Sequence, residues 1–303
     1  MNIVRHKKFT WVDIKNPIDE DLEWLGANFN LHPLVLKELL PPLDYPRVEN
    51  FGDYLFIVLF YPFFDKETFQ TIPFELDIII SKEYLITSRY KDIVPLKAIF
   101  DQCNIYEETR EEYFKDGPSL LLFRLIQEVF KASFPKISHI KENVGAIEEA
   151  VFRGKYSETM KNISLVERDI IGFERIIEPQ KLALMNLTKE VKIFFNKKTT
   201  PYFHTLENLY DQTQNMLKTQ HKSLNALKST NESLLANRTN EIIKLLTIFS
   251  VLVLPLTLVA SIFGMNTNYL PFGNMTNDFS IVVLFMVILE IVMLLFFKIK
   301  KWF

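Results

Sequence analysis

Two long apolar segments near the C-terminal end limit most strongly how this chain can fold. Leu245 to Phe263 is a run of 19 residues without a charge, and Phe279 to Phe297 is a second run interrupted only by Glu290. A helix needs about 20 apolar residues to cross the ~30 Å hydrocarbon core of a bilayer. We therefore predict an integral membrane protein with transmembrane helices at 242–264 and 279–297, joined by an outside loop at 265–278.

The first apolar segment carries a stripe of small and polar residues. Its members recur every three or four positions, which places them on one face of a helix: Asn240, Ile243, Thr247, Ser250, Leu254, Thr257, Ser261 and Gly264. Such a stripe marks either a contact between helices or a water-lined path. Two helices cannot enclose a conduit, so a pore would need several copies of the chain around an axis.

The charges around these segments predict how they are oriented. Arg238 and Lys244 precede the first segment and Lys298, Lys300 and Lys301 follow the second, whereas the connecting loop has no Lys or Arg. The positive-inside rule then places both termini in the cytoplasm of a multi-pass protein of the cell (inner) membrane. The polar start of the chain shows no signal peptide, and one cysteine permits no intrachain disulfide, as expected for a cytoplasmic soluble part.

Several classes of function lack support in the sequence. The balance of 35 basic and 37 acidic residues argues against a nucleic-acid-binding surface. No Gly-rich phosphate loop is present, so we expect no ATP-driven pump. No paired nucleophile and base is visible, and enzyme chemistry has no candidate residues. A run of acids at 107–112 could hold a divalent ion, but such runs are usually solvated helix faces.

The residues ahead of the membrane segments predict an α+β protein. Residues 1–115 should form a cytoplasmic α/β sheet domain, with short helices at 22–29 and 34–40 packed on strands. The expected strands are 8–14, 54–61, 75–80 and 84–88. Residues 116–200 should form an antiparallel helical pair, in which Pro135 kinks the first helix, Gly154 ends it, and Pro179 bends or divides the second.

A third helical region should join the soluble part to the membrane. After Pro201 no Gly or Pro occurs until Pro255, inside the first apolar segment. We therefore predict that a stalk, 201–241, and the first transmembrane helix form one helix ending near Phe263, roughly 95 Å long at 1.5 Å per residue. A basic cytoplasmic tail, 298–303, follows the second span.

The residue after this long helix offers the chemistry of an ion site. Asn266 ends the helix where the chain should leave the membrane, and a ring of Asn carbonyls would provide neutral oxygen ligands. Mg²⁺ sheds water reluctantly, so such a ring can hydrogen-bond the hydrated ion without stripping it. Gly264 would let the backbone approach the axis. Taken alone, Gly264-Met265-Asn266 is better explained as a helix stop. Its position at the end of the polar-striped segment, before a short outside loop, favours the ion site.

Motifs along nearly the whole chain resemble the CorA family of magnesium channels and transporters. Phe263-Gly264-Met265-Asn266 is similar to the family's Tyr-Gly-Met-Asn signature, with Phe for Tyr. Residues 237–247 resemble the family's Asn-Arg-x-Asn-Glu-x-Met-Lys-x-Leu-Thr segment, and residues 254–257 its Met-Pro-Leu-Thr. Further similarities lie at 11–14, 31–34, 53–56, 84–87, 133–135 and 300–302.

The resemblance implies a homopentamer with a funnel-shaped cytoplasmic domain and an inner ring of first spans. It implies an outer selectivity ring of Asn266 and Gly264, next to Met265, and an inner mouth at Asn240. Hydrophobic gate positions fall on Ile243, Leu246 and Leu254, with Thr257 and Ser261 lining the pore above them. The family pattern favours Leu246 where the polar stripe has Thr247.

The resemblance also implies Mg²⁺ as both the transported and the regulatory ion, with cytoplasmic Mg²⁺ bound between subunits. The regulatory ligands are a guess, Asp77 or Asp92 against Glu207 or Asp211 of a neighbour. Relatives often carry acids in the outside loop, whereas this chain has Asn268, Asn274 and Asn277, and only Asp278 is charged. Glu290 is also unusual, and we expect it to pack against a neighbouring helix.

Two alternatives remain at this point. The same fold could move Co²⁺, Ni²⁺ or Zn²⁺, although the intact Gly-Met-Asn favours Mg²⁺. The second is a membrane-anchored sensor or scaffold that contacts lipid but forms no pore and transports nothing. The polar stripe argues against it, because an anchor does not need one.

Overall fold

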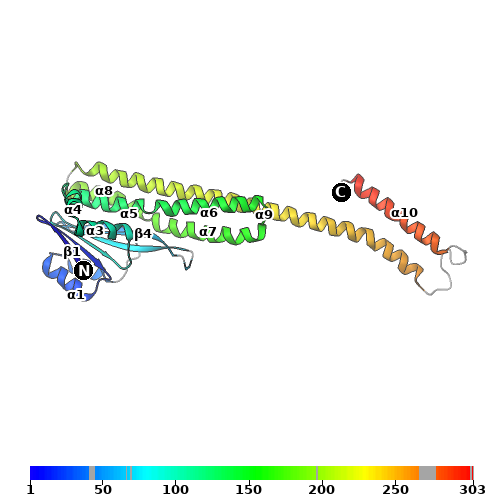
Figure 1. Ribbon diagram of the computed structural model, residues 1–303, viewed down its shortest axis with the longest axis horizontal. Helices are drawn as coiled ribbons and strands as arrows, with labels where there is room; N and C mark the ends of the chain where they lie inside the picture. Colours follow the sequence, from blue (N-terminus) through cyan, green and yellow to red (C-terminus); the bar gives the residue numbers. More distant parts are fainter. Residues whose placement is uncertain are drawn as a thin grey trace. The chain divides into compact units, whose positions relative to one another are not determined.

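The structure is a computed structural model that describes residues 1–40, 45–65, 67–68, 70–195, 197–265, 278–300 and 302. The chain divides into two compact units, Met1–Lys228 and Ser229–Phe303, and each is described by itself. The first unit contains a sheet and a set of helices (Figure 1). The second contains the end of one long helix and a further helix.

Six strands form one mixed sheet in the order β1-β2-β6-β5-β4-β3. They are β1 (Asn2–His6), β2 (Phe9–Lys15), β3 (Arg47–Asn50), β4 (Leu55–Asp65), β5 (Gln70–Ile80) and β6 (Tyr84–Arg89). β2 and β6 pair in parallel and the other neighbours antiparallel. The four predicted strands are confirmed. The two strands that the sequence did not predict, β1 and β3, are the short strands at the two edges, where the apolar alternation is weakest.

One face of the sheet is covered by α1 (Asp19–Asn28) and α2 (Pro33–Glu38). Val12, Val58, Ile79 and Ile86 project from four adjacent strands into this core, where Leu25 packs against them. The β-strand period of two places the intervening residues on the opposite face. The sequence therefore specifies two different apolar layers on one sheet.

The opposite face packs against α3 (Val94–Ile105), α4 (Glu107–Phe114) and α5 (Pro118–Lys131), and its β3–β5 part also contacts α7 (Tyr156–Ile177) and α8 (Gln180–Phe194). Trp11 is fully buried here, with its ring 4.9 Å from Phe100 in an edge-to-face arrangement. Its indole N–H donates to Thr87 Oγ1 at 3.1 Å, and the Thr87 hydroxyl donates to Asp13 at 2.8 Å. Asp13 forms an ion pair with Arg89, and both side chains are 3% exposed.

The helical pair predicted for 116–200 is four helices, α5, α6 (Phe134–Phe152), α7 (Tyr156–Ile177) and α8 (Gln180–Phe194). The prediction that Pro135 kinks a continuous helix is wrong: α5 ends at Lys131, and Pro135 lies in the first turn of α6. Proline has no N–H group, and the N–H groups in the first turn of a helix have no partner within the helix. Proline is therefore favoured in a first turn, where it begins a helix instead of bending it. Gly154, at φ +78°, follows the end of α6, and Pro179 divides α7 from α8, as predicted.

The prediction of one uninterrupted helix is confirmed by α9 (Thr200–Phe263), which has 64 residues and contains Pro255. Its beginning runs alongside the other helices of the first unit (Figure 1), where Phe203, Tyr210 and Leu217 are buried. The last helix is α10 (Asp278–Ile299). By length and apolar composition, the end of α9 and α10 are the two helices among the described residues that could cross a membrane.

Candidate metal-ion pathway

The end of α9 has one covered strip and one uncovered strip. The covered positions recur every three or four residues and are buried or half-buried: Lys244, Ile248, Leu252, Pro255, Val259 and Phe263. α10 shows the same spacing in its covered positions, Val282, Met286, Glu290, Met293 and Phe297. These two helices make up the second unit outside its loop, so we infer that they pack through these strips.

The predicted pore residues lie on the opposite side of α9. Each comes two positions after a covered residue, and two residues on an α-helix turn through roughly 200°. These pairs are Ser250 after Ile248, Leu254 after Leu252, Thr257 after Pro255, and Ser261 after Val259. The stripe therefore does not serve the contact between α9 and α10 within one chain.

Exposure within the stripe separates the two gate candidates that the sequence left open. Leu246 is 65% exposed and Leu254 is 66% exposed, whereas Thr247 is half-buried. Ile243, Asn240, Thr257 and Ser261 are exposed, and Ser250 is half-buried. Toward the start of the candidate membrane segment, the uncovered face is thus centred on Ile243 and Leu246 rather than on Thr247.

The hydroxyl groups of the stripe are oriented by their own helix. Thr257 Oγ1 donates to the carbonyl of Val253 at 3.0 Å, and Thr247 Oγ1 donates to the carbonyl of Ile243 at 2.8 Å. A hydroxyl that has given its proton to the backbone keeps two lone pairs as acceptors. Thr257 therefore offers oxygen acceptors, which suits the outward-pointing hydrogens of a hydrated cation.

The C-terminal end of α9 is followed directly by Gly264. Its N–H donates to Ala260 O at 2.9 Å, and a Cβ at this position would lie 3.0 Å from the same oxygen. A larger residue would crowd the last turn, so the close chain path favours glycine. Met265 is exposed. Asn266, Asn268, Asn274 and Asn277 lie outside the described residues, so Gly264 is the one described member of the predicted selectivity ring.

Glu290 lies in the covered strip of α10, the strip that packs on α9. Its side chain is half-buried, and Oε2 is buried without a hydrogen-bond partner in the part of the chain that the structure describes. This placement agrees with the expectation that Glu290 packs against a neighbouring helix.

The four residues guessed as regulatory ligands lie in separate environments within one chain. Asp92 pairs with Lys15 at 2.7 Å, Glu207 with His204 at 3.1 Å, and Asp211 with Lys181 at 3.1 Å. Asp77 is 1% exposed. Among the described residues no group of three or more His, Cys, Asp or Glu side chains is arranged to hold a metal ion. The regulatory site stays a prediction that needs a second subunit.

Asp77 has a chemical state that the sequence did not predict. It lies beside Glu75 on the same face of β5, near Arg47 and Glu38, and burial followed by the Glu75 charge raises its pKa well above the usual range. Two carboxyl groups two residues apart on one strand are the only sequence signal for this pair. The raised pKa favours the protonated carboxyl over the carboxylate that would bind a cation.

We expect Asp77→Asn to stabilise the protein at pH 8 by ~1–3 kcal/mol, the usual cost of a poorly satisfied buried polar group. The pKa of Asp77 is raised only in the folded state. The free energy of unfolding of the wild type therefore falls as the pH rises above about 4, the pKa of the carboxyl in the unfolded chain. Asparagine does not titrate, so the variant lacks this dependence on pH. Urea unfolding at pH 5 and pH 8 measures it. Asp92→Asn, in an exposed ion pair, is the control and should change stability by less than ~1 kcal/mol. A variant less stable than wild type at pH 8 would contradict the assignment.

The whole chain resembles known metal-ion transporters. The family model described as CorA-like Mg²⁺ transporter protein matches residues 6–301. The cobalt/magnesium transport protein CorA of Thermotoga maritima is 28% identical over 97% of this chain and 83% of its own length. The putative metal ion transporter YfjQ of Bacillus subtilis is 24% identical over 97% of this chain and 89% of its own length.

Solved structures agree with the fold. The complete structure of the CorA magnesium transporter from Methanocaldococcus jannaschii superposes with a TM-score of 0.85 at 21% identity, covering 100% of this chain and 95% of that one. The match includes the sheet unit, the long helix and both candidate membrane helices. The family model covers nearly every residue described above, and the chain therefore belongs to the CorA-like Mg²⁺ transporter family.

Proposed function

We propose that this chain is a homopentameric channel of the cell (inner) membrane, with both termini cytoplasmic, that admits hydrated Mg²⁺. The membrane potential would drive entry, because a potential of 100 mV is worth ~4.6 kcal/mol for an ion with two charges. Cytoplasmic Mg²⁺ bound between subunits would close it.

The observation that carries this proposal is the uncovered polar stripe on α9. α10 packs on the other side of the helix, so the stripe from Leu246 to Gly264 is available to other copies of α9. A polar side chain that faces lipid costs free energy, whereas one that faces a shared water-filled axis stays hydrated. Several copies around an axis would turn the stripe into a lining.

The lining chemistry suits a hydrated hard cation. It offers hydroxyl acceptors at Thr257 and Ser261 and, by the family resemblance, amide oxygens at Asn266, but no carboxylate or thiolate. Mg²⁺ keeps most of its waters and needs only hydrogen-bond acceptors around them, whereas Zn²⁺ sites in proteins use Cys and His. Co²⁺ and Ni²⁺ are further candidates, and the Thermotoga relative is named as a cobalt/magnesium transport protein.

The test is Mg²⁺ entry into proteoliposomes that hold a magnesium-sensitive dye, under an imposed potential, for wild type and Asn266→Ala. We expect wild-type flux and its loss in the variant, since a methyl group cannot hydrogen-bond the hydration shell. Asn277→Ala, in the same loop, is the matched control and should conduct. Flux of Zn²⁺ or Co²⁺ without Mg²⁺ would keep the channel and change the ion. If folded, pentameric protein moves no divalent ion, the scaffold alternative takes its place.

A further inference from the structure

A cavity of about 410 Å³ at one end of the sheet is lined by an unusual number of cationic groups. Four lysines surround it, Lys7, Lys8, Lys82 and Lys115, together with the half-buried His6. None of the four lysines forms an ion pair within the described part of the chain, and Glu83 is the one acidic side chain among the described lining residues. The nearby Asp116 is held by Arg124 at 2.6 Å. The cavity therefore carries uncompensated positive charge.

The two turns that carry three of these lysines are held in place. Ser81 Oγ accepts hydrogen bonds from the N–H groups of Glu83 and Tyr84, both at 3.0 Å, and fixes the β5–β6 turn around Lys82. The N–H of Thr10 donates to Glu83 O at 3.0 Å, which ties this turn to β2 beside Lys8. Lysines on fixed turns lose less freedom when they bind an anion.

The floor and one wall of the cavity are also ordered. Phe9 and Phe114 pack edge to face at 5.5 Å beneath the lysines. Helix α5, of 14 residues, begins at the wall, and its N-cap residue Gly117 has no side chain to accept from the first N–H groups. Such a helix start adds a favourable field for an anion to that of the lysines.

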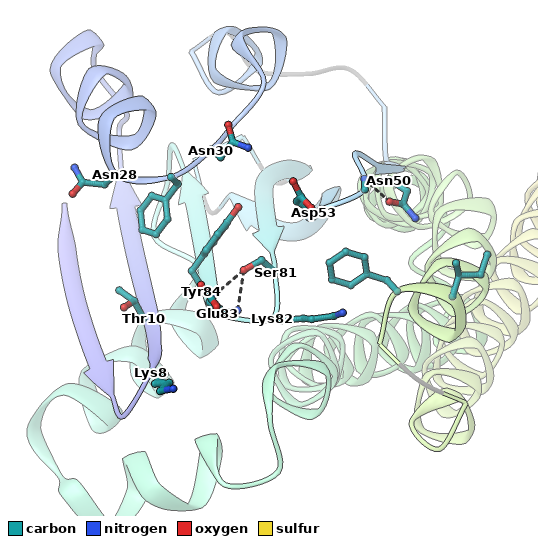
Figure 2. Close-up of a pocket in the computed structure, with 14 residues that line it drawn as sticks. Lys8, Thr10, Asn28, Asn30, Asn50, Asp53, Ser81, Lys82, Glu83 and Tyr84 are labelled. Carbon is teal, nitrogen blue, oxygen red and sulfur yellow. Dashed lines mark hydrogen bonds between the residues drawn. The ribbon is translucent and has the colours of Figure 1, made fainter.

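A second cavity, of about 850 Å³, adjoins the first and shares Lys8, Lys82 and Glu83 with it. Figure 2 shows Asn28, Asn30 and Asp53 around its opening, with the Tyr84 hydroxyl pointing toward the side of Asn30 and Asp53. Burial raises the pKa of Tyr84 to about 12, so its hydroxyl remains a donor at neutral pH. With Asp53 and Glu83 opposing two lysines, this cavity has no net charge and offers amide and hydroxyl groups instead.

We propose that the lysine-lined cavity binds the phosphate groups of a small phosphorylated molecule. Phosphate matches the chemistry best, because several lysines together satisfy its many acceptor oxygens. The neighbouring cavity gives room for an uncharged polar portion, such as a nucleoside. The ligand is either a free inorganic phosphate or a nucleotide, and the site does not depend on ion transport.

The experiment is isothermal titration of the full-length protein in detergent with pyrophosphate, ATP and adenosine, without divalent ions. We expect pyrophosphate to bind, and to bind more weakly as salt is raised, since the lysines are exposed. Lys8→Gln with Lys82→Gln should weaken binding at least roughly tenfold. Lys141→Gln, an exposed lysine on α6, is the control and should bind as wild type. An unchanged thermal midpoint shows that the double variant is folded.

The three ligands distinguish the source of the phosphate. ATP binding more tightly than pyrophosphate assigns the nucleoside to the second cavity, whereas equal or weaker binding assigns the site to inorganic phosphate. Lys115→Gln tests the same cavity from α5's side and should also weaken pyrophosphate. No pyrophosphate binding at millimolar concentration, or equal binding by the double variant and the Lys141→Gln control, would overturn the proposal.

Discussion

A positive charge attached at Thr257 should stop Mg²⁺ flux almost completely. Thr257→Cys can be modified in the folded protein with a cationic thiosulfonate, which adds a fixed charge to the uncovered face of α9. At ~5 Å and an effective dielectric constant of ~20, one charge repels a divalent ion by roughly 7 kcal/mol. Flux should then fall more than 100-fold, since each 1.4 kcal/mol is tenfold. Flux into dye-loaded proteoliposomes before and after modification gives the result.

The chain provides its own controls for this experiment. Cys103 is fully buried, and burial raises its pKa to about 11, so the native thiol should not react. Ile262→Cys is also exposed near this end of α9 but is turned by roughly 140° from Thr257. The same reagent should leave its flux unchanged. If modified Ile262→Cys is blocked and modified Thr257→Cys conducts, the assignment of the pore face is wrong.

Arg89→Met should lower the free energy of unfolding by about 3–5 kcal/mol, because it leaves Asp13 as an unpaired charge inside the sheet unit. Both side chains of the pair are 3% exposed. Asp13→Asn combined with Arg89→Met should recover most of the loss, since the amide is neutral and can still bond Thr87. Urea unfolding of the full chain in detergent, followed by tryptophan fluorescence, measures both.

An exposed ion pair provides the reference for this loss in the free energy of unfolding. Arg153 bonds Glu149 at 3.0 Å with both side chains at least 70% exposed. Arg153→Met should therefore cost less than ~1 kcal/mol. A double variant at Asp13 and Arg89 that is as unstable as Arg89→Met would show that the buried charge is not the cause.

Sequence reasoning succeeded where the physical signal is local and periodic. The 64-residue helix follows from an unbroken stretch of helix-compatible residues, and its membrane portion from an uncharged run. The four inner strands follow from apolar alternation and β-branched residues. Proline misled the prediction only at Pro135, because the same residue can bend a helix or begin one, and the neighbouring turn decides.

The sequence by itself determined the class of this protein, its two membrane segments and the stripe of residues that would line a pore. Spacing along one helix specifies a face, whatever else the chain does. Only the tertiary structure decided which side of that helix is covered: Pro255 and Val259 are half-buried, whereas Thr257 and Ser261 are exposed. It also decided that Asp77 is buried near Arg47 and Glu38 and that lysines from three separate segments surround one cavity. These are contacts between residues far apart in the chain, and no local pattern encodes them.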